Sequence, residues 1–150
     1  MLKPIALATL VSGTLDILFA VILTLAYGRE PANMLRFVGS GPFAGATEMG
    51  AAGAVLGLVV HFILMALMAA IFMGLVRLRP VLIDTPWRTG LAYGVVTYFA
   101  MNWAVVPLRF GAPLPPSGMS VATQLFAHIV LVGLPFAFIA RRFKAELVRI

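Results

Sequence analysis

Residues 49–76 read MGAAGAVLGLVVHFILMALMAAIFMGLV, a stretch without a charged side chain in which His61 is the one ionisable group. About 20 apolar residues in a helix are enough to cross a hydrocarbon layer of about 30 Å. This stretch therefore predicts a membrane-spanning helix. An ionisable side chain at membrane depth is costly, so we expect His61 to face other helices and to have a partner or a task there.

The composition of the whole chain indicates the same class of protein. Of its 150 residues, 62% are hydrophobic and only 11% are charged, which lies outside the usage of soluble domains. Four stretches have the length and composition of membrane spans, namely residues 4–28, 49–76, 87–108 and 120–141. The sequence thus predicts an all-α, integral membrane four-helix bundle that forms a single domain over residues 1–150.

The cations lie between and after the predicted spans, and not along one helix face. If both termini are cytoplasmic, that side carries Lys3, Arg77, Arg79, Arg88, Arg141, Arg142, Lys144 and Arg149, and the other side carries Arg29, Arg36 and Arg109. This distribution satisfies the positive-inside rule and predicts a multi-pass protein with both termini in the cytoplasm. The net charge of +6 is therefore interpreted as a topology signal and as contact with anionic lipid, with no nucleic-acid partner.

The first span has features of a secretory signal, because Lys3 precedes a long apolar run. We interpret it as a retained helix. The run is longer than a typical signal core of about 7–15 residues, it contains Asp16, and it ends at Tyr27-Gly28-Arg29 without a small-x-small cleavage site.

The segments between spans also carry signals. Residues 31–48 are too apolar for a free loop, and Pro31 suits the first position of a helix, so we expect a short interfacial helix on the outer face, with a re-entrant loop as the alternative. On the inner side, Asp84-Thr85-Pro86-Trp87 is typical of a helix start, with Asp or Thr as the cap.

Small residues indicate which helix faces pack. Gly50, Gly53 and Gly57 share one face of the second span, and His61 lies one turn further along it. In the third span, Gly90 and Gly94 share a face with Tyr98 and Asn102. We expect these glycine faces to bring helices together, within the chain or between copies of it.

Polar groups occur at similar depths in all four spans. With a rise of about 1.5 Å per residue, Asn102 and His128 lie roughly 9–12 Å from the outer end, and Asp16 and His61 lie roughly 15–17 Å from it. The sequence predicts that these groups converge in one polar cluster, which could hold a proton or a ligand: Asp16, His61, Tyr98, Asn102, Gln124 and His128.

Two similar stretches surround the histidines, Leu58-Val59-Val60-His61-Phe62-Ile63-Leu64 and Leu125-Phe126-Ala127-His128-Ile129-Val130-Leu131. They suggest a parallel repeat of two helical hairpins. The layout from about residue 57 onward, with Pro107, the pair Pro115 and Pro116, Phe126-Ala127-His128 and Arg141-Arg142, resembles small uncharacterised bacterial inner-membrane proteins of the YagU-like kind. The resemblance implies an inner-membrane location and four helices, and it assigns no catalytic residue.

Three functions fit the polar cluster. It could be structural, because interhelical hydrogen bonds fix helix register, in a structural, accessory or partner-binding membrane component. Alternatively, Asp16 and His61 could relay protons in a small transporter or channel that acts as an oligomer, with Pro107 and Pro135 as flexible points. A third hypothesis is a haem b cytochrome with His61 and His128 as axial ligands on facing helices.

Other chemistry has little support in the sequence. The chain has no cysteine, which excludes disulfides, thiolate catalysis and iron–sulfur or cysteine–zinc sites. No nucleophile with a neighbouring base, phosphate-binding glycine loop or metal-ligand spacing is present. We therefore expect no catalytic residues and no metal site apart from the haem hypothesis.

Overall fold

A computed structural model describes residues 1–116 and 118–148 of the chain. Every regular element in these residues is helical. In chain order they are α1 (Leu2–Ala26), α2 (Pro31–Gly39), η1 (Ala44–Glu48), α3 (Gly50–Leu78), η2 (Pro80–Ile83), α4 (Pro86–Phe99), η3 (Ala100–Val105), α5 (Val106–Phe110), α6 (Gly118–Phe126), η4 (Ala127–Gly133), α7 (Leu134–Arg142) and α8 (Lys144–Val148). The short elements η1 and η2 are 3₁₀ turns, whereas η3 and η4 are π-helical segments that join their neighbours into continuous helices.

Four of the resulting helices are long and apolar enough to cross a membrane: Leu2–Ala26, Gly50–Leu78, Pro86–Phe110 and Ser120–Arg142. Many of their large apolar side chains are exposed on the surface of the protein. Ile22 is 63% exposed and Ile63 is 62% exposed, for example. Soluble monomers rarely expose such continuous apolar surfaces, which in lipid cost nothing. These are the features of a multi-pass membrane protein, as the sequence predicts.

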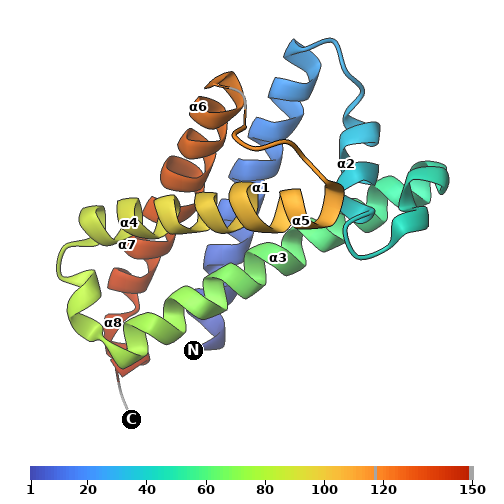
Figure 1. Cartoon of the computed structure of the whole chain (residues 1–150). Helices are drawn as coiled ribbons and strands as arrows, with labels where there is room; N and C mark the ends of the chain where they lie inside the picture. Colours follow the sequence, from blue (N-terminus) through green and yellow to red (C-terminus); the bar gives the residue numbers. More distant parts are fainter. Residues whose placement is uncertain (117, 149–150) are drawn as a thin grey trace.

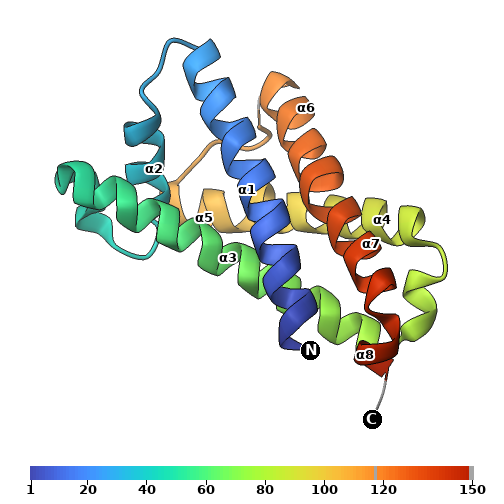
Figure 2. The ribbon, with the colours of Figure 1, turned by 180° about the vertical axis from the view of Figure 1, so that it is seen from behind.

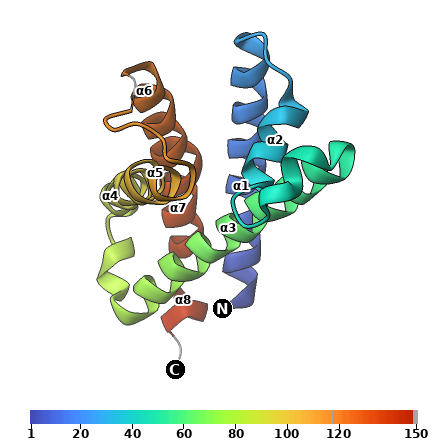
Figure 3. The same ribbon diagram turned by 45° about the vertical axis from the view of Figure 1, so that its right-hand side comes forward.

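The four long helices form two layers that cross each other steeply. Helix α1 and the continuous helix α6–η4–α7 run side by side in opposite directions, and they contact each other through η4 and α7 (Figures 1 and 2). Helices α3 and α4–η3–α5 form a second layer across them. Figure 3 looks almost along α4 and α5 while α1 and α6 stand upright. The arrangement is thus a crossed one, unlike bundles whose helices lie within about 20° of parallel.

The best-packed region lies at the end of the molecule where both termini meet (Figure 1). Its fully buried side chains include Phe72 and Met73 of α3, Ile83 of η2 and Phe136 of α7. Tyr93 of α4 joins this core, and its ring lies edge-on to Phe72 with 4.8 Å between the ring centroids. The terminal ends of the long helices are therefore held together by ordinary hydrophobic packing.

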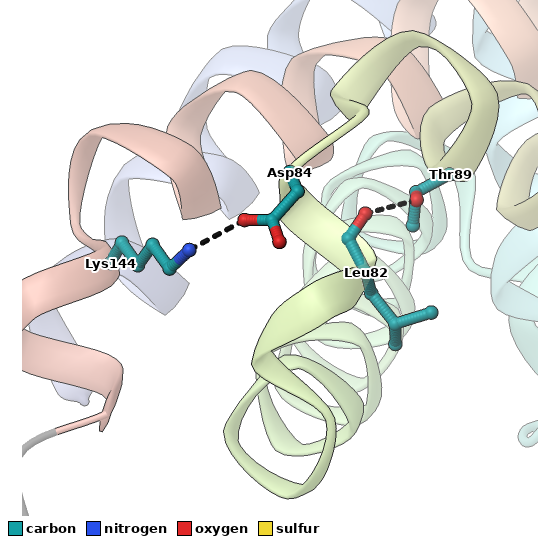
Figure 4. Close-up of polar contacts among 4 residues, drawn as sticks. All are labelled: Leu82, Asp84, Thr89 and Lys144. Atoms are coloured by element: carbon teal, nitrogen blue, oxygen red, sulfur yellow. Dashed lines mark hydrogen bonds and ion pairs between the residues drawn. The ribbon is translucent and has the colours of Figure 1, made fainter.

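Polar contacts close the same end (Figure 4). Lys144 Nζ of α8 lies 2.6 Å from Asp84 Oδ1, and the Thr89 hydroxyl donates a hydrogen bond to the Leu82 carbonyl oxygen. The expected cap of α4 is different in the structure. Thr85 is the N-cap residue and Pro86 follows it, but neither Asp84 nor Thr85 makes a side-chain capping bond. Asp84 pairs with Lys144 because the chain brings α8 against η2.

At the opposite end, the short helix α2 and the turn η1 lie on the first half of α3. The Gly53–Gly57 face packs there, and not against another long helix as a bundle would require. A Cβ atom on Gly57 would lie 1.8 Å from the Leu35 carbonyl oxygen, and one on Gly53 would lie 2.0 Å from that of Ala46. Gly50 makes no such contact. Its φ of +54° allows the chain to turn into α3, so its predicted packing role is wrong.

The closest contact between long helices joins α4 to the π-helical segment η4. A Cβ atom on Gly94 would lie 2.6 Å from the His128 carbonyl oxygen, and one on Gly90 would lie 2.8 Å from that of Gly133. Three glycines thus let the two backbones touch. Gly53, Gly57, Gly90 and Gly94 are therefore all in close contact with other segments of the same chain.

Candidate functional site

His61 ties α3 to α1. Its Nε2 atom lies 2.9 Å from the Gly13 carbonyl oxygen, and the residue is buried. A carbonyl oxygen only accepts, so Nε2 carries the hydrogen and donates it. Gly13 allows this approach because a side chain there would collide with the Phe62 ring, 2.6 Å from its Cε1 atom. The histidine is thus placed by a close backbone contact between the two helices.

Asp16 faces the other nitrogen of the same imidazole. Its Oδ2 atom lies 3.9 Å from His61 Nδ1, and the Asp16 side chain is 23% exposed. This distance is longer than a hydrogen bond and within range of an ion pair. The pair lies one turn along α1 from Gly13, so a single face of α1 supplies both the acceptor for Nε2 and the carboxylate near Nδ1.

His128 belongs to a separate group of residues on α4 and η4. Its Nδ1 atom lies 3.1 Å from Thr97 Oγ1, and the Thr97 hydroxyl donates to the Gly94 carbonyl oxygen over 3.0 Å. Since the Thr97 hydrogen is used there, His128 Nδ1–H is the donor to Thr97. The Tyr98 ring lies edge-on to the imidazole, 6.2 Å between centroids.

The remaining predicted residues lie outside both histidine contacts. Asn102 of η3 donates from Nδ2 to the Tyr98 carbonyl oxygen, 3.2 Å away on its own helix. Gln124 lines a cavity near the end opposite the termini. Asn102 and His128 both lie in π-helical segments, and each of these segments ends just before a proline, Pro107 or Pro135, whose missing N–H interrupts the α-helical bonding.

The predicted single cluster is therefore two groups. Asp16 and His61 join α1 to α3, whereas His128 and Thr97 join η4 to α4. In the described part of the chain, no hydrogen bond, ion pair or ring contact connects the two groups. The two imidazoles hydrogen-bond to different helices, whereas the haem hypothesis places both on one bound group. The crossed arrangement causes this, because it places the His61 helix α3 against α1 and the His128 segment η4 against α4.

Sequence reasoning missed three participants. Thr97 is the partner of His128, the Gly13 carbonyl is the partner of His61, and the Tyr93 hydroxyl donates to the Met68 carbonyl oxygen over 2.7 Å. Thr97 lies three residues after Gly94, on the glycine face, and that spacing was a usable signal. A backbone carbonyl as a partner has no signature in the sequence.

A cavity of about 490 Å³ opens between α1 and α6 at the end opposite the termini. Its lining is unusually polar for this chain and consists of Ala20, Leu23, Thr24, Tyr27, Arg29, Met34, Ser120, Thr123 and Gln124. Its deepest residue on α1, Ala20, lies one helical turn from Asp16. On α6, Gln124 lies one turn from His128. The cavity thus approaches both groups from the same end.

Three buried hydroxyls make no hydrogen bond within the described residues: Thr9 Oγ1, Ser12 Oγ and Tyr98 Oη. Thr9 and Ser12 lie on the face of α1 that also carries Asp16, toward the terminal end. Most buried polar groups in proteins have a partner in the protein or in ordered water. This face of α1 is therefore suited to bound water on the terminal side of Asp16.

Comparison with family models, with curated proteins and with solved structures finds no significant match for this chain. In the described residues, no three histidine, aspartate or glutamate side chains come together in a way that could hold a metal ion. The site must accordingly be interpreted from its own chemistry.

Proposed function

We propose that this chain is a multi-pass protein of the bacterial inner membrane and serves there as a structural, accessory or partner-binding component. Both termini lie in the cytoplasm. The charge distribution supports this orientation, because the end with the two termini also carries Arg77, Arg79 and Arg88, whereas the opposite end carries Arg29, Arg36 and Arg109. The YagU-like layout of the sequence agrees with the same location.

One observation carries the structural role. Each buried histidine uses a ring nitrogen to bond a neighbouring helix, His61 to Gly13 of α1 and His128 to Thr97 of α4. Interhelical hydrogen bonds in membranes contribute about 0.6 kcal/mol on average and at most about 1.7 kcal/mol. Such bonds fix the rotation of a helix about its axis, which a surface of apolar side chains against lipid does not.

The end opposite the termini has the features expected at the outer face of the inner membrane. Helix α2 begins at Pro31, and the turn η1 follows it on the surface of α3. Arg109 of α5 donates hydrogen bonds to the carbonyl oxygens of Ser40 and Gly41, and the Phe37 and Phe110 rings stack 4.3 Å apart. We infer that α2 lies in the interface, with its apolar side on α3 and its one cation, Arg36, near the headgroups.

The test compares stability with proton flux in the same variants. We expect His61→Ala and His128→Ala each to lower the free energy of unfolding by about 0.6 to 1.7 kcal/mol, measured by titration with dodecyl sulfate in mixed micelles. Liposomes containing the wild-type protein should conduct protons no faster than empty liposomes. The visible spectrum of protein purified with full haem supply should be featureless.

Other outcomes would replace the proposal. Proton flux that is lost in Asp16→Asn, with folding intact, would make the chain a transporter or channel. A Soret band that is lost in both His61→Ala and His128→Ala would make it a cytochrome. Alanine variants as stable as the wild type would remove the histidines from any structural role.

A further inference from the structure

We propose that Asp16 and His61 together bind one proton, and that this proton enters from water through the cavity between α1 and α6. This proposal goes beyond the structural role of His61. The structural hydrogen bond uses Nε2, whereas the proton site uses Nδ1. The side of the membrane to which the cavity opens rests on the orientation of the termini proposed above.

The hydrogen bond to Gly13 fixes the tautomer of His61. Because Nε2–H donates to the Gly13 carbonyl oxygen, 2.9 Å away, the neutral imidazole has its lone pair on Nδ1. That lone pair faces Asp16 Oδ2 at 3.9 Å. With Asp16 ionised and His61 neutral, two acceptors would face each other in a medium that screens charge poorly. One bound proton removes the conflict, either as Asp16 O–H toward Nδ1 or as His61 Nδ1–H⁺ toward the carboxylate.

The proton balance is simple. Uptake forms one bond, to Asp16 Oδ2 or to His61 Nδ1, and the proton comes from a water molecule or hydronium in the cavity. Release breaks that bond and returns the proton to water. At 3.9 Å, a direct transfer between the two groups needs a small side-chain rotation or one bridging water.

His61 is the one titratable group of a packed neighbour that lies at the level of Asp16. The elements that pack on α1 are α2, α3, η4 and α7, and their charged or titratable side chains are Arg36, His61, Arg77, His128, Arg141 and Arg142. The arginines lie near the ends: Arg36 reaches the Gly50 carbonyl oxygen, and Arg77 reaches Met1. His128 bonds to Thr97 of α4. Among these described side chains, His61 alone is therefore placed to balance the negative charge of Asp16.

The cavity gives the pair a route to water. Thr24 and Ala20 line it on α1, and Asp16 continues the same face one turn deeper. Its mouth carries Arg29 and Tyr27, which hold water more readily than the apolar lining elsewhere. On α1 the lining of the cavity ends at Ala20, and the rings of Phe19 and Phe126, which lie 5.1 Å apart and join α1 to α6, do not line it. Asp16, with 23% of its side chain exposed, lies just beyond.

The first experiment measures the proton itself. The chain has two histidines, so protein labelled with ¹⁵N-histidine in lipid nanodiscs gives two imidazoles, and His128→Gln leaves only His61. We expect His61 to keep hydrogen on Nε2 across the titration and to gain it on Nδ1. Asp16→Asn should change the pH at which Nδ1 gains this hydrogen, because it removes the carboxylate that lies 3.9 Å from Nδ1.

Two results would overturn the proton site: His61 with its hydrogen on Nδ1 in the neutral form, or the same His61 midpoint in Asp16→Asn as in the wild type. If Asp16→Asn does not fold, the tautomer of neutral His61 in the wild type is by itself a sufficient test of the proton site. His128 is the internal control, and its titration in Asp16→Asn should match that of the wild type.

The second experiment tests access. The natural chain has no cysteine, so a single introduced cysteine reports without background. Ala20→Cys and Thr24→Cys should react with a membrane-impermeant maleimide added outside spheroplasts. Ile22→Cys, on the lipid-facing side of the same helix at the same depth, should stay unlabelled. Equal labelling of all three, or of none from either side, would overturn the route through the cavity.

Labelling of Ala20→Cys and Thr24→Cys only in inside-out vesicles would give a different answer. The proton site and its cavity would stand, and the proposed orientation of the termini would be wrong. Failure of the site and failure of the orientation are thus distinguished by which side of the membrane the reagent is on.

Discussion

At the scale of single residues, two buried tyrosines on α4 differ in whether the hydroxyl has a hydrogen-bond partner. The Tyr93 hydroxyl donates to the Met68 carbonyl oxygen of α3, whereas the Tyr98 hydroxyl makes no hydrogen bond within the described residues. Both rings are almost fully buried, with exposures of 9% and 2%. The two residues therefore differ mainly in what the hydroxyl does.

We expect Tyr93→Phe to lower the free energy of unfolding by about 1 kcal/mol, because it leaves the Met68 carbonyl without this donor. Tyr98→Phe should leave it unchanged or raise it, since it removes a buried hydroxyl that has no protein partner. Dodecyl sulfate titration of the two variants side by side measures the difference. A larger loss in Tyr98→Phe would contradict the assignment of partners.

At the scale of elements, the contact between α4 and η4 depends both on glycines and on a π-helical segment. The α4–η4 contact needs both Gly90 and Gly94 on one side and Gly133 on the other. The π-helical turn of η4 then carries His128 to Thr97, while the next residues lead into Pro135. A proline that lacks an N–H is tolerated in a membrane helix when a local π turn satisfies the freed carbonyls. Local geometry therefore accounts for the presence of Pro107 and Pro135 within long helices.

The glycines divide into two kinds, and a matched pair of substitutions separates them. Gly94→Ala places a Cβ atom 2.6 Å from backbone atoms of His128 and Ile129, and we expect a loss of about 1–3 kcal/mol. Gly74→Ala, inside α3, meets nothing within 4 Å and should stabilise the helix by up to about 1 kcal/mol. Unfolding titrations of both variants check the signs. Equal effects would mean that α4 and η4 are not in backbone contact.

At the scale of the whole molecule, packing differs between the end that holds the termini and the opposite end. The end with both termini has a continuous core around Phe72 and Phe136, and it is closed by α8 and η2. The opposite end holds the cavity between α1 and α6, and a second, apolar cavity of about 600 Å³ between α2, α3 and α5. A smaller apolar cavity of about 400 Å³ lies between α3, η2 and α4, nearer the termini, so the larger cavities are at the opposite end.

The orientation of this asymmetry can be measured with fusions. Green fluorescent protein fused to the C-terminus should fluoresce, because it folds in the cytoplasm, and alkaline phosphatase fused there should be inactive. Alkaline phosphatase fused after Gly111, which follows α5 at the opposite end, should be active. The reverse pattern at both positions would place the termini outside and contradict the positive-inside interpretation.

The sequence predicts the spans well because hydrophobic length is a local property. The predicted spans 49–76 and 120–141 differ by at most two residues at either end from the helices Gly50–Leu78 and Ser120–Arg142. The sequence also shows which residues should avoid lipid, namely the ionisable ones inside the apolar spans. Of these, His61 and His128 are both buried. In the candidate site, Asp16 and His61 do lie near each other, as equal depth on two helices suggested.

The sequence by itself therefore determined the class of protein, the four long helices and the residues that could not face lipid. The tertiary structure alone decided which of those residues meet. Helical periodicity shows on which face of its own helix a residue lies. Which residue it meets there depends on the angles at which the helices cross and on which helices are neighbours. Gly53 and Gly57 thus pack on α2 and η1, His61 bonds to a backbone carbonyl, and His128 bonds to Thr97 instead of joining His61. These partners are set by the steep crossing of the two helix layers.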